Sequence, residues 1–254
     1  MSALLSIVVA FSMYSRIPMP RVEWTETSMR YAMCAFPLVG VVQGLICLAW
    51  GIAVAAFGVP REIAAAAFVV LPILVNGGIH LDGLADTHDA LASHAPRDKK
   101  LAIMKDSASG AFAVIAVGCH LILLYALFAN MPLDIRALAC LPLLYGLSRA
   151  LSAIAVVGWP SARPEGMAGT FSKNADTRRS TAVLVAFAIA LCCGLIAAHG
   201  ALGACVAAAG LAVFGVYRAV AMKVFGGVTG DLAGWFVQYA ELAMVAVVVI
   251  GGLV

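Results

Sequence analysis

The chain has 254 residues, of which 63% are apolar and only 11% are charged, and its formal net charge at pH 7 is +3. Soluble domains carry about a quarter charged residues, so this composition excludes a soluble globular protein and indicates a chain whose solvent is mainly lipid. The apolar runs are long and continuous, which favours a bundle of helices over a transmembrane β-barrel, and we expect no nucleic-acid partner.

The N-terminal segment, residues 1–15, is apolar and carries no cationic side chain. A secretory signal peptide has a basic region before its apolar core, whereas the first basic residue here, Arg16, follows it. At about 1.5 Å per residue the segment is short for a full crossing. We therefore expect a helix that lies in or dips into the membrane, and the sequence leaves open whether it crosses.

Apolar stretches with few or no charges predict the membrane spans. In chain order they cover residues 31–60, 63–79, 107–133, 135–159, 180–217 and 232–254. The stretch 180–217 is long enough for two short helices, with a turn at Ala198-His199-Gly200. The expected fold class is all-α: a polytopic transmembrane helical bundle of about seven spans plus a short N-terminal membrane-associated helix, as one domain over residues 1–254.

Basic residues are concentrated in four of the connecting segments. Residues 16–30, 80–106, 159–180 and 218–231 hold thirteen of the sixteen lysines and arginines, and they alternate along the chain with connections that hold few. By the positive-inside rule these four loops face the cytoplasm and the C-terminus faces out. The expected location is therefore the cytoplasmic (inner) membrane, with lipid as the surroundings of the bundle.

The most informative stretch of the sequence is NGGIHLDGLADTHD, residues 76–89. Asp82, Asp86 and Asp89 stand at i, i+4 and i+7, so a helix would place the three carboxylates on one face. Like charges at this spacing repel unless a cation lies among them, and carboxylate oxygens suit Mg²⁺, with water and substrate phosphate as further ligands. A solvated helix end would look the same, but charge beside a membrane span is costly and usually functional.

A fourth carboxylate, Asp106, lies where the same loop returns to the membrane, between Lys105 and Ser107. Arg149 and Glu241 lie inside expected spans, where ionisable residues are expensive. We expect Arg149 to contact phosphate, while Glu241 fits a structural ion pair and a substrate contact equally well. The segment GGVTGD at 226–231 fits either a phosphate cradle or a flexible loop. The expected metal ligands are Asp82, Asp86, Asp89 and Asp106.

Several of these motifs resemble the cobalamin synthase family, also called adenosylcobinamide-GDP ribazoletransferases. They are GGIHLDGLADT at 77–87, KDS followed by a glycine at 105–110, and GVTGD at 227–231, and RIPMP at 16–20 resembles the N-terminal pattern of the family. The matches run in the family's order from near one end of the chain to the other, and the first motif is the most specific.

The resemblance implies a Mg²⁺-dependent transferase of the cytoplasmic membrane. It would join adenosylcobinamide-GDP to α-ribazole, or to α-ribazole 5′-phosphate, and release GMP. The ions would stabilise the departing GMP, and one carboxylate or His80 would take the proton of the attacking ribose hydroxyl. Homo-oligomers and association with other cobalamin-assembly enzymes are left open. The expected catalytic residues are Asp82, Asp86 and His80, and the expected substrate-binding residues are Gly77, Gly78, Lys105, Ser107, Arg149, Thr229 and Asp231.

Two other functions remain open. A CDP-alcohol phosphotransferase that makes phospholipid would share the chemistry, but its Asp-Gly-x-x-Ala-Arg pattern is incomplete here. A cation or proton transporter would explain Arg149 and Glu241, but it would not need so many carboxylates in one cytosolic patch.

Overall fold

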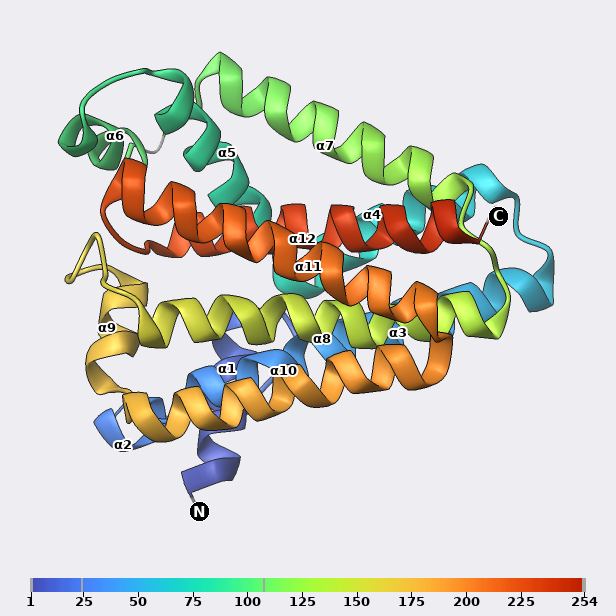
Figure 1. Ribbon diagram of the computed structural model, residues 1–254, viewed down its shortest axis with the longest axis horizontal. Coiled ribbons are helices and arrows are strands. Elements are labelled where there is room, and N and C mark those ends of the chain that lie inside the picture. The colour runs from blue at the N-terminus through green and yellow to red at the C-terminus, as the bar shows by residue number, and fades with distance from the viewer. Residues whose placement is uncertain (1, 24, 107, 253–254) are drawn as a thin grey trace.

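The computed structural model describes residues 2–23, 25–106 and 108–252. In this part of the chain the regular structure is helical, apart from one isolated parallel bridge between Ser161 and Val228 (Figure 1). The all-α prediction is therefore confirmed. The elements are α1 (Ser2–Tyr14), α2 (Glu26–Met29), α3 (Ala32–Phe57), α4 (Arg61–Asn76), α5 (Ile79–Ala92), α6 (Arg97–Ile103), α7 (Ala111–Ala129), α8 (Ile135–Gly158), α9 (Met167–Asn174), α10 (Thr177–His199), α11 (Ala201–Val220), the π-helix η1 (Ala221–Phe225) and α12 (Gly230–Gly251).

Five segments of the described chain are long and apolar enough to cross a membrane: α3, α7, α8, the stretch Thr177–Phe225 and α12. The pair α4 and α5 passes the same test only together, and it is bent by 95°. Gly200, with a φ of 57°, ends α10, and α11 then packs back along α10. The expected turn is confirmed. The expected number of about seven spans is reached only if this turn divides the long stretch and the bent pair counts as one span.

The long helices lie side by side, and their connections gather at the two ends of the bundle (Figure 1). The short helices α2, α6 and α9 lie at one end, and the C-terminus lies at the other. Each of these short helices belongs to one of the basic loops, and η1 belongs to the fourth. The structure therefore brings the basic loops to the same end, as the alternation of charge predicts.

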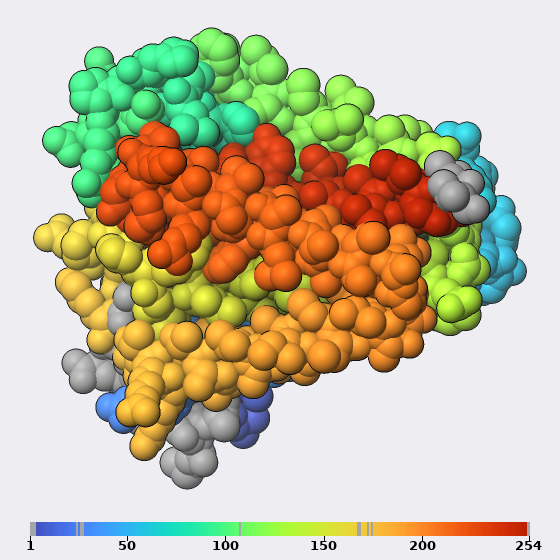
Figure 2. Space-filling model, in the orientation of Figure 1, coloured from blue at the N-terminus to red at the C-terminus, as the bar shows by residue number. Residues whose placement is uncertain are grey.

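The outer surface of the bundle is apolar. The face shown in Figure 2 is formed largely by α10, α11 and α12, and exposed side chains of these helices include Ile189, Leu211 and Ile250. Apolar groups on the outside of a long helix suit lipid as the surrounding medium. By contrast α8 is almost entirely buried, since α3, α10 and α12 pack around it.

The N-terminal helix α1 packs against α3, with Val9, Ala10 and Phe11 buried. Its helical structure is confirmed, while its relation to the membrane stays a prediction. The break between α4 and α5 is formed by Gly77 and Gly78, which both have positive φ, 70° and 83°. Glycine adopts this conformation without steric cost, so these two residues set the 95° bend that directs α5 toward the end with the basic loops.

Candidate active site

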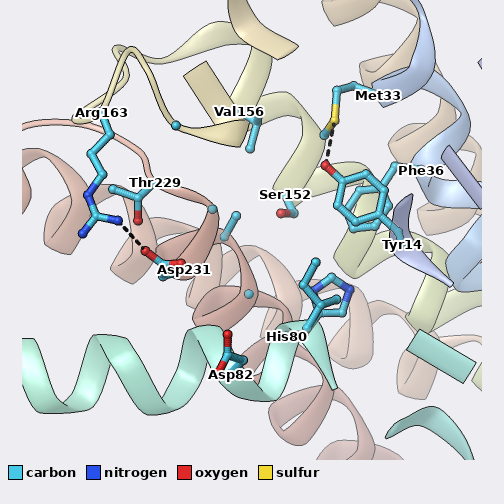
Figure 3. A pocket seen from close by; sticks show the side chains of 15 residues that line it. Tyr14, Met33, Phe36, His80, Asp82, Ser152, Val156, Arg163, Thr229 and Asp231 are labelled. Atoms are coloured by element: carbon cyan, nitrogen blue, oxygen red, sulfur yellow. Dashed lines mark hydrogen bonds and ion pairs between the residues drawn. The ribbon is translucent and has the colours of Figure 1, made fainter. Parts of the chain in front are cut away.

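A cavity of about 280 Å³ lies where α5 and α12 meet α1, α3, α8 and the loop after α8 (Figure 3). Its polar lining consists of His80 and Asp82 from α5, Ser152 from α8, Arg163 from the loop, and the residues around the start of α12. The complete lining is Tyr14, Met33, Phe36, Ile79, His80, Asp82, Ser152, Val156, Arg163, Gly166, Thr229, Gly230, Asp231, Ala233 and Gly234.

Two glycines allow α5 and α12 to approach closely beside the cavity. A Cβ atom on Gly83 would lie 2.6 Å from the backbone oxygen of Asp231, and one on Gly234 would lie 3.1 Å from the Cα atom of His80. Small residues at a helix crossing let two backbones come together. The crossing places Asp82 and Asp231, from segments about 150 residues apart in the chain, on the wall of one cavity.

The start of α12 is held by a loop built from the glycine-rich segment. The hydroxyl of Thr229 accepts a hydrogen bond from the backbone N–H of Leu232 (3.1 Å) and caps the helix. The backbone of Val228 donates to Pro160 (2.8 Å) and accepts from Ala162 (2.9 Å), so the two loops are tied together. A Cβ on Gly227 would lie 2.5 Å from the oxygen of Pro160. Gly227 therefore allows the two loops to pack closely together. Thr229 and Asp231, which come next in the chain, line the cavity.

Arg163 is the cation of the cavity wall, on a loop for which the sequence predicts no role. Its Nη1 lies 3.0 Å from Oδ2 of Asp231, and its Nη2 donates to the backbone oxygen of Leu101. The Nε of Arg163 is buried and has no hydrogen-bond partner in the described structure. The only signal in the sequence is that Arg163 stands in a basic loop between two spans.

The carboxylates around Arg163 interact with one another. Asp86 lies in the C-terminal half of α5, outside the five spanning segments. Partial burial, followed by the charges of Asp82, Asp231 and Asp89, raises the pKa of Asp86 to about 6, and Arg163 opposes that shift. The site therefore holds more negative charge than Arg163 neutralises, which favours a further cation.

His80 lies deep in the cavity wall. It is buried, its ring lies beside the adjoining rings of Tyr14 (6.5 Å between centroids) and Phe36 (5.8 Å), and its Nε2 has no hydrogen-bond partner in the described structure. The Tyr14 hydroxyl lies 3.6 Å from the sulfur of Met33 (Figure 3). A buried ring nitrogen without a partner at a cavity wall is available to a ligand.

Two of the expected metal ligands, Asp89 and Asp106, accept hydrogen bonds from backbone groups and do not line the cavity. The Asp89 carboxylate accepts hydrogen bonds from the backbone N–H groups of Gly110 (2.5 Å) and Ala113 (2.8 Å), so it holds the start of α7. Asp106 is exposed, and it accepts a hydrogen bond from the N–H of Ala108 (3.0 Å). In the described chain, no three His, Cys, Asp or Glu side chains are grouped closely enough to hold a metal ion.

Three further expected substrate contacts, Gly77, Gly78 and Lys105, do not line the main cavity. Gly77 and Gly78 line a shallower hollow that also includes Asp82, and the side chain of Lys105 is exposed. Ser107 lies outside the described residues.

Arg149 is buried in the core and does not line the cavity. It forms an ion pair with Glu241, and its guanidinium also donates to Ser148 Oγ (2.9 Å) and Gln43 Oε1 (3.2 Å). The expected phosphate contact is therefore replaced by contacts within the protein.

The sequence pattern of the family described as cobalamin-5-phosphate synthase matches residues 6–249. An adenosylcobinamide-GDP ribazoletransferase of Lachnoclostridium phytofermentans is 38% identical over 98% of this chain and 95% of its own. Proteins with the same name from Pseudomonas aeruginosa (34% identical, over 95% of this chain and 96% of its own) and Azorhizobium caulinodans (32%, over 97% and 96%) are also similar. No solved structure matches. The chain belongs to the cobalamin-5-phosphate synthase family.

Proposed function

We propose that this chain is an adenosylcobinamide-GDP ribazoletransferase, which completes the nucleotide loop of cobalamin. The family match and the relatives of that name cover nearly the whole chain. The observation that carries the proposal is the cavity on which Asp82, Asp231 and Arg163 meet, since carboxylates and a guanidinium suit a site for phosphoryl-group transfer.

In the proposed reaction a ribose hydroxyl of α-ribazole, or of its 5′-phosphate, forms a bond to the phosphorus next to cobinamide. The bond from this phosphorus to the bridging oxygen breaks, and GMP leaves with the electron pair. The hydroxyl proton has to be taken up in the cavity. His80 is suited to accept it because its Nε2 is free of protein partners at the cavity wall.

Arg163 is proposed to bind the diphosphate. A guanidinium forms two parallel hydrogen bonds to phosphate oxygens, and Arg163 already holds an anion, Asp231, at 3.0 Å. The tie between the loops around Ser161 and Val228 keeps Arg163 beside the start of α12. The cavity of about 280 Å³ suits the reacting diphosphate, and the corrin ring would remain outside it.

The residues fit a Mg²⁺ ion, although the described chain groups no three ligands for one. Mg²⁺ in proteins is usually held by one or two carboxylates, with substrate phosphates and water as the other ligands. Asp82 and Asp231 line the cavity, and Asp86 interacts with both of these carboxylates. The bound ion would neutralise charge on the departing phosphate. Of the four expected ligands, Asp82 and Asp86 are kept, and Asp231 replaces the other two.

We propose that the cavity end of the bundle faces the cytoplasm across the inner membrane. Support comes from the four basic loops, whose short helices α2, α6 and α9 gather at one end (Figure 1).

The test uses the full chain reconstituted in liposomes. GMP release from adenosylcobinamide-GDP is measured with and without α-ribazole, and with Mg²⁺ or with excess EDTA. We expect release only when both α-ribazole and Mg²⁺ are present, with one cobalamin formed for each GMP. GMP release at the same rate without α-ribazole would instead identify a hydrolase, and no release under any condition would reject the proposal.

A further inference from the structure

A second hollow, of about 550 Å³, lies between α5, α7 and α12, and it shares no lining residue with the candidate active site. We call it the α7 groove. On α7 its lining is a single stripe at helical spacing, Phe112, Ile115, Ala116, Cys119, His120 and Leu123; α5 adds His88, Leu91 and Ala92, and α12 adds Tyr239 and Leu242.

The outer rim of the α7 groove belongs to a helix that faces lipid. Phe112 and Ile115 are each 59% exposed and Leu123 is 53% exposed, on a helix long and apolar enough to cross the membrane. The bilayer core offers no water to cover this rim, so lipid chains are its surroundings.

The length of the α7 groove corresponds to one leaflet. From Phe112 to Leu123 the stripe rises about 16 Å at 1.5 Å per residue, which is close to half of the roughly 30 Å hydrocarbon core. Phe112 stands near the start of α7, at the end of the bundle where the basic loops gather. The α7 groove therefore runs from that surface of the membrane to about its middle, as one acyl chain does.

The floor of the α7 groove is polar. His88 Nε2 lies 2.8 Å from the Tyr239 hydroxyl, and His120 Nε2 lies 2.8 Å from Gln238 Oε1. The His120 side chain is almost fully buried, and its Nδ1 has no hydrogen-bond partner in the described structure. The Tyr239 hydroxyl can donate a hydrogen bond to an ester oxygen of a lipid. His120 Nδ1 can only accept one, because the ring uses its Nε2–H on Gln238 Oε1.

The headgroup end of the α7 groove lies next to a basic connection. Residues 93–110 join α5 to α7, the two helices that line the α7 groove, and carry four cationic side chains against two carboxylates. Lys99 and Lys105 in this connection are exposed. Basic residues at a membrane surface attract anionic headgroups.

From this length, polar floor and charge, we propose that the α7 groove binds an anionic phospholipid of the leaflet beside the basic loops. One acyl chain lies along the stripe on α7, and the headgroup lies beside Lys99 and Lys105. The bound lipid packs against α5 and α12, which also carry Asp82 and Asp231.

The test uses the full chain in nanodiscs that contain phosphatidylglycerol and phosphatidylcholine in equal amounts. A trace of either lipid carries a diazirine in the middle of one acyl chain, and mass spectrometry locates the cross-links after illumination. We expect the phosphatidylglycerol probe to label the stripe on α7 about fivefold more than the phosphatidylcholine probe for each lysine that reaches the headgroup. The exposed face of α10 should react equally with both.

Two variants test separately the shape of the α7 groove and the charge beside it. Ala116→Trp should fill the α7 groove and remove the labelling, whereas the matched control Gly118→Trp, whose Cβ would meet no atom within 4 Å, should leave it unchanged. Lys99→Gln with Lys105→Gln should remove the preference for phosphatidylglycerol and keep the labelling. Equal labelling of the stripe by both probes in the unchanged chain would overturn the proposal, and so would a stripe shielded from both.

Discussion

Replacing both partners of the buried Arg149–Glu241 ion pair by methionine should restore about half of the stability lost when one partner is replaced. Both side chains are buried, 1% and 7% exposed. Removing one partner of a buried pair leaves an uncompensated charge and costs about 3–5 kcal/mol, whereas apolar replacement of both is often neutral.

The contacts around the pair refine this expectation. In the double variant Ser148 Oγ keeps its bond to the backbone oxygen of Tyr145 (2.9 Å), but Gln43 loses its contact with the guanidinium. An unpaired buried amide costs about 1–3 kcal/mol. The double variant should therefore unfold about 1–3 kcal/mol more easily than the unchanged chain, and each single variant about 3–5 kcal/mol more easily.

The assay combines unfolding in mixed micelles with GMP release. We expect Arg149→Met with Glu241→Met to keep substantial transfer, because neither side chain lines the cavity. A double variant that is as stable as expected but has lost transfer more than about 100-fold would show that Arg149 acts on the substrate, since loss of one transition-state donor has an effect of this size. That result would refute a purely structural role for the ion pair.

Three further outcomes are expected. Asp82→Asn should lower GMP release by roughly 100-fold or more with an unchanged melting temperature; near-normal turnover would exclude Asp82 from the site. Arg163→Gln should lower kcat/KM for adenosylcobinamide-GDP by about 10- to 100-fold, as loss of a charged hydrogen bond does, and Arg163→Lys should recover part of it; equal loss in both variants would point to a fork that Lys cannot replace. Gly83→Ala should cost about 1–3 kcal/mol of stability and reduce transfer, because its Cβ would meet the Asp231 backbone at 2.6 Å, whereas the control Gly118→Ala should leave transfer unchanged and should not lower stability.

The spans and the central motif could be predicted because each depends on local sequence. Apolar runs longer than a membrane crossing give helices whatever their neighbours are, and the motif around Asp82 is continuous in the chain. The turn at Gly200 also depends on one residue with a positive φ.

The residues that form the site could not all be predicted, because tertiary packing brings them together and helical spacing in the sequence does not show that packing. Asp89 shares a helix face with Asp82 in sequence, but the N–H groups that begin α7 occupy its carboxylate. Arg163 faces Asp231 because a bridge between two distant loops brings them together. Arg149 was expected to be functional because charge is costly in lipid, and the partner that neutralises it lies on α12, about 90 residues later.

The turn at Gly200 lies at the end of the bundle away from α2, α6 and α9 (Figure 1), and Gly200 is exposed and contacts nothing at its Cβ position. Neither helix of this hairpin lines the cavity. A short peptide tag inserted there would leave the reaction undisturbed and would report, by its accessibility to antibody in intact cells, which side of the membrane that end occupies.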